Sequence, residues 1–501
     1  MTNGRQVESK RFISDVLWVG LTQVFIYLTG IVVIPALTKN YTTQVYGLWS
    51  QMVVTVGFLR ILTIKFDSAT IRFLAAEEDK EKRRRALGAM LWPILALIVF
   101  VLVISLLLRQ SLSILLFTDS QYVNFIPLVL IWAATEALFD FALSYLRARG
   151  QMKTFSSTRL ASAVIRMFVI VSVALAGYDF YWIVTGIIIT QALFLFAVSA
   201  MIVREVGLPT FNFEGLKKYV TYSVPMLPGE VLHWIDNASD RYFIAHFLNI
   251  SQTGIYSASY SLASLLSLLS WPIGMVLFPA VTRLWEQGDI EKVKGYFQYS
   301  MKLFLTLSVP AAVGLYILSQ PLLGLLATSD YVVKGVLVLL LAIGGVFGGV
   351  FLINGYTIFL LKKTGWLPVI DAIGAVINVI VNIFLIPVIG ISGAAVSTIV
   401  AYFIISVIII IWGRRMINYK LDFKFLGKVV AASLLMSASL WFIEVNSVLS
   451  IILVIIAGVS VYGLGLYLLR AFSREDRKVI RDALSGLGIR FKSAGQGHTG
   501  T

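Results

Sequence analysis

Ionisable and amide side chains lie within several long apolar stretches of this 501-residue sequence. They are Arg60, Glu136, Asp140, Arg166, Glu230, His233, Asn237, Asp240, Arg241 and Asp371. A charged group at bilayer depth is costly, so it normally faces the interior of a helix bundle or a wet cavity. Guanidinium groups there offer charged hydrogen-bond donors, and ionised carboxylates offer acceptors. These residue types therefore predict a polar cavity inside a membrane protein.

The richest stretch, 222–247, places its polar side chains on two adjoining faces of a helix. One face holds Glu230, Asn237 and Arg241, and the other holds His233, Asp236 and Asp240. Pro225 and Pro228 precede them, and prolines at such positions can bend a span and expose its backbone to a cavity. His233 is a candidate protonation switch, although a buried histidine with satisfied hydrogen bonds is the commoner case.

Glu136 and Asp140 lie four residues apart and so share one helical face. Two carboxylates in a span are costly unless they are wet, protonated or paired, and Arg166 on the next span is a candidate partner. Buried arginine–carboxylate pairs often only hold helices together. For each single residue, the sequence supports a structural role and a functional role equally. The whole set comes from several spans and favours a functional cavity.

Membrane spans are the elements that must position these residues. Hydrophobic residues make up 58% of the chain and charged residues 13%, whereas soluble domains carry about 25% charged residues. A span needs about 20 largely apolar residues, so the composition predicts an all-α polytopic membrane protein with about 14 transmembrane helices. The predicted spans are 12–37, 44–66, 86–108, 122–146, 157–177, 181–203, 222–247, 254–279, 301–318, 333–361, 366–387, 392–412, 427–443 and 448–470.

Most of the 41 Lys and Arg residues fall in alternate connections between these spans. Connections rich in Lys and Arg normally face the cytoplasm, so the pattern predicts an even number of spans with both termini cytoplasmic. Lys65 and Asp67, at the inner end of the second span, are expected to snorkel to the surface. The stretch 473–487 is expected to be an amphipathic helix that anchors the tail at the interface.

Several types of chemistry are excluded by composition. The chain has no cysteine, which excludes disulfides and thiolate chemistry, and its three histidines lie far apart, which disfavours a metal site. No Walker A motif is present, so direct ATP hydrolysis is not expected. No basic folded domain is visible, so a nucleic-acid partner is not expected either.

The sequence resembles itself at an offset near 207 residues. Lys10-Arg11-Phe12 matches Lys217-Lys218-Tyr219, and Gly47-Leu48-Trp49 matches Gly254-Ile255-Tyr256. Six spans in each repeat preserve orientation, so two parallel, pseudo-symmetric six-helix lobes are expected, an architecture in which substrate sites lie between the halves. The predicted divisions are an N-terminal lobe at 1–205, a C-terminal lobe at 206–415, accessory spans at 416–472 and a cytoplasmic tail at 473–501.

The chain resembles the polysaccharide and O-antigen (Wzx-type) flippase branch of the multidrug/oligosaccharidyl-lipid/polysaccharide (MOP) exporter superfamily. The resemblance covers essentially the whole chain and uses four short signatures besides the arrangement of spans. They are Tyr46-Gly47-Leu48-Trp49, Asp240-Arg241-Tyr242, Gly254-Ile255-Tyr256-Ser257-Ala258, and Asn378 through Pro387 followed by Gly390-Ile391-Ser392-Gly393-Ala394-Ala395. These signatures are loose and rich in apolar residues, so they indicate the superfamily better than the substrate.

The resemblance implies two lobes that form a V around a central cavity and work by alternating access. It implies a transporter, not an enzyme, that moves an isoprenoid-diphosphate-linked oligosaccharide from the inner to the outer leaflet of a prokaryotic plasma membrane, for cell-surface polysaccharide biosynthesis. No cofactor is expected apart from a coupling ion, H⁺ or Na⁺. The expected partners are the lipid-linked glycan and membrane lipids, with a polysaccharide polymerase machinery as a further candidate.

Other functions compete with this one. A cation-coupled multidrug exporter of the same superfamily would favour acidic cavity residues, whereas cationic and acidic groups are mixed here. A lipid II flippase has a similarly cationic cavity, and sequence alone separates it poorly. A membrane glycan polymerase or transferase needs a sizeable loop with catalytic groups, and the outer loops here are short. A scaffold without transport activity would not explain a repeat with charges inside the membrane.

Overall fold

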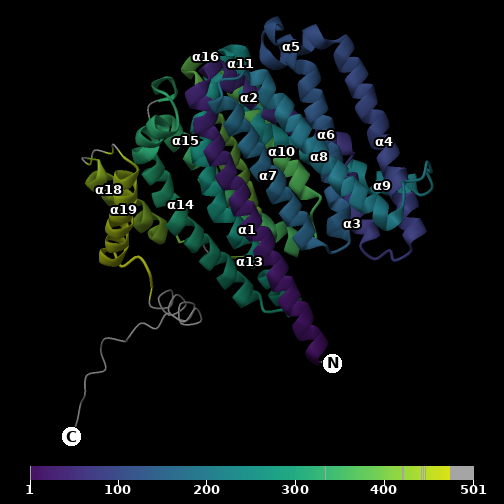
Figure 1. Ribbon diagram of the computed structural model, residues 1–501. Coiled ribbons are helices and arrows are strands. Elements are labelled where there is room, and N and C mark those ends of the chain that lie inside the picture. The colour runs from purple at the N-terminus through teal and green to yellow at the C-terminus, as the bar shows by residue number, and fades with distance from the viewer. Residues whose placement is uncertain are drawn as a thin grey trace.

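The computed structural model describes residues 2–332, 335–419, 422–441, 443, 445 and 447–473. This part of the chain is all-helical, as predicted, and contains no strand (Figure 1). The first eight α-helices are α1 (Thr2–Asn40), α2 (Thr43–Leu59), α3 (Phe66–Leu74), α4 (Lys80–Leu107), α5 (Arg109–Phe117), α6 (Phe125–Ala148), α7 (Met152–Leu175) and α8 (Phe180–Val206). We call them the N-terminal lobe. Almost all of the predicted tail, 473–501, lies outside the described residues.

The next nine α-helices form what we call the C-terminal lobe, and two more follow it. The nine are α9 (Leu216–Ser223), α10 (Leu227–Ala238), α11 (Asp240–Phe247), α12 (Ile250–Ala263), α13 (Ser267–Glu286), α14 (Ile290–Leu326), α15 (Val336–Leu360), α16 (Trp366–Ile389) and α17 (Ile391–Ile417). The last two, α18 (Phe423–Leu440) and α19 (Val448–Leu468), pack against each other and against α14. Short 3₁₀ turns are η1 (Arg60–Thr63), η2 (Ser120–Tyr122), η3 (Val224–Met226), η4 (Ser264–Leu266) and η5 (Ser329–Tyr331).

Polar residues at the borders of the apolar stretches begin several helices. The side chains of Thr42, Asp79 and Asn249 accept hydrogen bonds from backbone N–H groups in the first turns of α2, α4 and α12. These N–H groups have no partner within the helix, so each cap stabilises a helix end. At Asp79 the backbone N–H groups of Lys82 and Glu81 also hold the pKa of the carboxyl below its ordinary value.

Thirteen helical segments of the described chain are long and apolar enough to cross a membrane. The predicted span at 222–247 is absent from this set because it is not one continuous helix. It is divided into the end of α9, η3, α10 and α11, with Pro225 inside η3 and Pro228 at the beginning of α10. A proline cannot donate a backbone hydrogen bond, so these two residues account for the first interruption. The predicted span that is richest in polar side chains is therefore carried by short helices.

The two lobes meet where α2 packs against α12. Within the N-terminal lobe, α1 packs along α7 (Figure 1). A Cβ atom on Gly47 would lie 1.9 Å from the carbonyl oxygen of Ile250, and one on Gly254 would lie 2.3 Å from that of Thr43. Only glycine permits such close backbone approach. Gly254 follows Gly47 by 207 residues, and Ile250 follows Thr43 by the same number, which is the offset of the sequence repeat. The two contacts are therefore equivalent in the two halves. Equivalent positions of the two halves thus touch across the interface.

Candidate functional site

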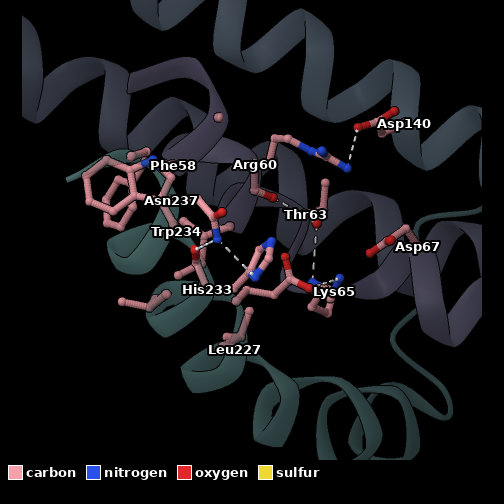
Figure 2. A pocket seen from close by; sticks show the side chains of 15 residues that line it. Phe58, Arg60, Thr63, Lys65, Asp67, Asp140, Leu227, His233, Trp234 and Asn237 are labelled. Carbon is pink, nitrogen blue, oxygen red and sulfur yellow. Dashed lines mark hydrogen bonds and ion pairs between the residues drawn. The ribbon is translucent and has the colours of Figure 1, made fainter. Parts of the chain in front are cut away.

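A polar cavity of about 190 Å³ lies between the lobes, where α2, η1 and α3 face α10 (Figure 2). Its polar lining residues are Arg60, Thr63, Lys65, Asp67, Asp140, Glu230, His233 and Asn237. Five of the ten residues predicted from sequence therefore meet here. They are Arg60, Asp140, Glu230, His233 and Asn237. We call this space the central cavity.

An unusual backbone turn shapes the N-terminal wall of the central cavity. After η1 the chain passes through two consecutive left-handed residues, Ile64 at φ 53° and Lys65 at φ 56°. Such a conformation costs of order 1–3 kcal/mol for a residue other than glycine, and strained backbone of this kind concentrates at functional sites. Beyond this turn, Lys65 Nζ lies 2.6 Å from Glu230 Oε1 on α10. The Lys65–Glu230 ion pair therefore joins the two lobes across the cavity.

Asp140 on α6 holds two arginines. Its Oδ2 lies 3.1 Å from Arg60 Nη2, as Figure 2 shows, and its Oδ1 accepts a hydrogen bond from Arg159 Nη1 at 3.4 Å. The Asp140 side chain is only 10% exposed, whereas that of Arg60 is 55% exposed. A nearly buried carboxylate needs cationic partners, and two arginines supply them. More than half of the Arg60 side chain therefore remains accessible.

The α10 wall of the central cavity is held against the other lobe by Trp234. Its indole Nε1 donates to the Val54 carbonyl oxygen at 2.9 Å, and its ring lies 4.8 Å from that of Phe58. Asn237 Nδ2 donates to the His233 carbonyl oxygen at 2.8 Å, so the two cavity-facing polar residues of α10 are linked within one helical turn (Figure 2). The site is thus built on elements of both lobes.

Glu136 and Arg166 form the ion pair that the sequence suggested, but outside the central cavity. Arg166 Nη1 donates to Glu136 Oε2 at 3.3 Å. Arg166 lines a separate space of about 390 Å³ between α1, α2, α6, α7 and η4, which we call the Arg166 cavity. The stacked rings of Trp49 and Trp132, with centroids 5.6 Å apart, also line it.

Asp240 and Arg241 do not line the central cavity; they are buried within the C-terminal lobe. Their exposures are 1% and 6%. Asp240 accepts a hydrogen bond from the Tyr256 hydroxyl, and the Arg241 guanidinium lies 4.0 Å from the centre of the Tyr260 ring. Tyr242, the third residue of this signature, forms a 2.5 Å hydrogen bond with Thr55 on α2. The signature 240–242 therefore ties α11 to α12 and to the other lobe.

Asp371, the tenth predicted residue, lies on α16 outside the central cavity. It is close enough to interact electrostatically with Asp236 and with His233. Asp236 is 8% exposed, and its Oδ1 makes no hydrogen bond to another described residue. Asn378 accepts from Asn382 Nδ2 at 2.8 Å, while its own Nδ2 is unbonded within the same part of the chain. This side of the C-terminal lobe therefore holds a buried polar cluster with unsatisfied groups.

The sequence analysis missed three charged residues that contribute to these sites. Lys65 and Asp67 were expected to snorkel to the surface, but both line the central cavity because the left-handed turn redirects the chain. Arg159 was counted among the basic residues of a connection, yet it lies two turns inside α7. The spacing of seven residues between Arg159 and Arg166, which share one helical face, was the signal that could have identified it.

A family model described as "Polysaccharide biosynthesis protein" matches residues 41–334, which is more than half of the chain. The chain belongs to this family. A curated relative, the "Probable low-salt glycan biosynthesis flippase Agl15" of Haloferax volcanii, is 25% identical over 288 residues. That match covers 56% of this chain and 59% of the relative, so it spans about three fifths of the relative's length.

Solved structures of the superfamily have the same fold. The lipid II flippase MurJ in an inward closed conformation matches with a TM-score of 0.77 at 16% identity, covering 93% of this chain and all of the other. An inward-facing multidrug resistance MATE transporter matches with a TM-score of 0.60 at 12% identity, covering 80% of this chain and 94% of the other. These findings confirm the predicted resemblance to the polysaccharide branch and the predicted fold of a multi-pass membrane protein.

Proposed function

We propose that this protein is a flippase that moves an isoprenoid-diphosphate-linked oligosaccharide from the inner to the outer leaflet by alternating access. The central cavity supports this proposal most directly. It lies between the lobes and combines Arg60 and Lys65 with Asp67, Asp140 and Glu230. Cationic donors suit a phosphate and carboxylates suit sugar hydroxyls, so a mixed cavity suits a substrate that carries both. A transporter needs no catalytic group, and we propose no enzymatic reaction.

The family membership and the printed name of the Haloferax volcanii relative support a glycan as the substrate. Mixed charge in the central cavity argues against a site specialised for organic cations. We further propose that the protein lies in a prokaryotic plasma membrane, with both termini cytoplasmic and the basic connections on the cytoplasmic surface. Membrane lipids surround the bundle, and polysaccharide polymerase machinery is a candidate partner.

A coupling ion, H⁺ or Na⁺, is part of the proposal. The candidates for binding it are carboxylates inside the bundle. The sequence suggested Glu136, Asp140 and Asp371, and the structure adds Asp236, whose buried Oδ1 has no partner among the described residues. An unpaired buried carboxylate is costly unless it binds a proton or a cation.

The test is to delete the gene in its native host and to measure the sidedness of lipid-linked glycans with a membrane-impermeant glycan-cleaving enzyme. We expect intact lipid-linked glycan to accumulate on the cytoplasmic face, and wild-type protein to restore its export. An Arg60→Gln copy is expected to restore at most about a tenth of the export, because a charge-assisted contact is lost. Arg109→Gln, at an exposed arginine of α5, is the matched control and should restore export fully.

Other outcomes of the same test would redirect the interpretation. Normal sidedness with increased drug sensitivity would indicate a multidrug exporter. Accumulation of a peptidoglycan precursor alone would indicate a lipid II flippase. Normal sidedness with shortened glycans would contradict transport and indicate a role in polymerisation.

A further inference from the structure

Two cavities are stacked along one face of α7, between this helix and α1. The first, of about 840 Å³, is lined on α7 by Met152, Phe155, Ser156 and Arg159, and we call it the Arg159 cavity. The second is the Arg166 cavity, lined on α7 by Ala163, Arg166, Met167 and Ile170. These positions recur at intervals of three and four residues, so they form one continuous stripe of the helix surface. The stripe leads from the beginning of α7 into the bundle.

Residues of the C-terminal lobe also line both cavities. Met275 of α13 lines the Arg159 cavity, and Ser261, Ser264 and Leu265 line the Arg166 cavity. On the opposite side α1 contributes Val19, Thr22 and Gln23 to the first cavity and several residues between 26 and 34 to the second. The stripe thus lies in the interface between the lobes, as the central cavity does.

Both arginines of the stripe have unused hydrogen-bond donors. A guanidinium has five N–H groups. Within the described part of the chain, Arg159 donates once, to Asp140 at 3.4 Å, and Arg166 donates once, to Glu136 at 3.3 Å. Both contacts are longer than the ~2.7–2.9 Å of a strong charge-assisted hydrogen bond. The carboxylates therefore orient the arginines while leaving most donors available for an anion.

Spacing along the helix separates the two guanidinium positions. Seven residues of α-helix correspond to a rise of about 10 Å. Asp140 links the stripe to the central cavity, because one of its oxygens contacts Arg159 and the other contacts Arg60 (Figure 2). An anion at Arg159 therefore competes with the same carboxylate that orients Arg60.

The surface of α1 places the stripe close to lipid. Leu21, Phe25 and Leu28 are 54%, 52% and 48% exposed on α1, so this side of the helix faces hydrocarbon if the bundle is in a bilayer. Residues of α1 also line both cavities of the α7 stripe, so one helix adjoins both the apolar surface and the stripe. A diphosphate that is bonded to an isoprenoid cannot move far from hydrocarbon, so a site for it must lie near the lipid-facing wall.

We propose that the α7 stripe is an anion track that binds the diphosphate of the lipid-linked substrate, first at Arg159 and then at Arg166. This inference rests on the proposed function and names the part of the substrate that this second site receives. Glu136 and Asp140 hold the arginines while the track is empty. The arriving diphosphate offers several oxygens to each guanidinium and displaces the long carboxylate contacts.

Because the sequence contains no cysteine, a single cysteine introduced on the α7 stripe can be labelled selectively, and its reactivity reports on the track. Single cysteines at Met152 and Met167 would report on the Arg159 and Arg166 cavities. The purified protein in lipid nanodiscs is treated with two methanethiosulfonate reagents of similar size, one a sulfonate anion and one a quaternary ammonium cation. We expect the anion to react about tenfold faster than the cation at both positions, because arginines line both cavities. Geranylgeranyl diphosphate should slow both reactions.

Matched variants distinguish local charge from misfolding. In the M167C background, Arg166→Gln should abolish the preference for the anionic reagent, whereas Arg166→Lys should retain it. Thr328→Cys, at an exposed residue before η5 that lines neither cavity, is the control and should show no preference for the anion and no protection. Equal rates for both reagents at M152C and M167C, or no protection by the diphosphate, would overturn the track.

Failure of the track and failure of the proposed function give different results. Export of lipid-linked glycan without charge preference or protection on α7 would leave the flippase intact and reject the track. Charge preference and protection in a protein that leaves glycan sidedness unchanged in cells would retain the anion site and reject the flippase.

Discussion

At the scale of single residues, Asp140 is the connection between the polar spaces of the protein. It is nearly buried on α6 and contacts one arginine in the central cavity and another in the Arg159 cavity. The sequence identified this carboxylate and its neighbour Glu136 from their spacing. It named Arg166 as a candidate partner of these two carboxylates. Arg166 pairs with Glu136, whereas Asp140 holds Arg60 and Arg159. The spacing of residues along a helix predicts which side chains share a face. It does not predict which helix packs against that face, because the packing involves spans that lie far apart in sequence.

We expect Asp140→Asn to reduce glycan export at least about tenfold. The neutral amide cannot balance two guanidinium charges in a poorly solvated site, so both arginines lose their orientation. The measurement is the sidedness assay at matched protein abundance. Asp119→Asn, at an exposed residue of the loop before η2, is the control. Wild-type export by the Asp140→Asn protein would show that the two arginines act without this carboxylate.

At the scale of elements, the interruptions of the helices decide where charges lie. The prolines at 225 and 228 predicted a bend in the seventh span, and the structure confirms that this span is not one continuous helix. The interruption after α2 was not predictable, because Ile64 and Lys65 are not residue types that favour a left-handed conformation. Tertiary packing imposes this turn, and with it the ion pair that Lys65 makes with Glu230.

The Lys65–Glu230 pair is expected to hold α3 and α10 together across the central cavity. Lys65→Glu or Glu230→Lys alone should lower glycan export several-fold, because each change places like charges opposite one another. The double exchange, Lys65→Glu with Glu230→Lys, should restore much of the loss. Export measured for the four proteins gives the coupling between the two residues. Strictly additive defects in the double variant would mean that the residues act independently.

At the scale of the whole molecule, the sequence repeat has a spatial counterpart. Ser50 and Ser257, 207 residues apart, form a 2.6 Å hydrogen bond in the contact between α2 and α12. Gly47 and Gly254 make reciprocal close approaches in the same contact. The signatures that carried the family resemblance therefore lie largely in the interface between the lobes and not in the central cavity. This explains why they indicate the superfamily and leave the substrate open.

Gly47→Ala is expected to open this contact. The added methyl group would lie 1.9 Å from the Ile250 carbonyl oxygen, so α2 and α12 must move apart. Overpacking of this kind costs about 1–3 kcal/mol, and we expect a lower thermal unfolding midpoint in detergent together with reduced export. Gly427→Ala on α18, where a new Cβ meets no atom within 4 Å, is the matched control. An unchanged midpoint for Gly47→Ala would contradict the tight contact.

The most direct test of the central claim, that transport requires the lobes to separate at the α2–α12 contact, is a reversible cross-link in this cysteine-free chain. Ser50→Cys and Ser257→Cys place two thiols at adjoining positions, and mild oxidation should join them. Glycan export or flipping in proteoliposomes is then measured for the oxidised, reduced and single-cysteine proteins. We predict loss of transport on oxidation of the double variant, full recovery with a reductant and no response of either single variant. Undiminished transport by the fully cross-linked protein would contradict alternating access through this contact.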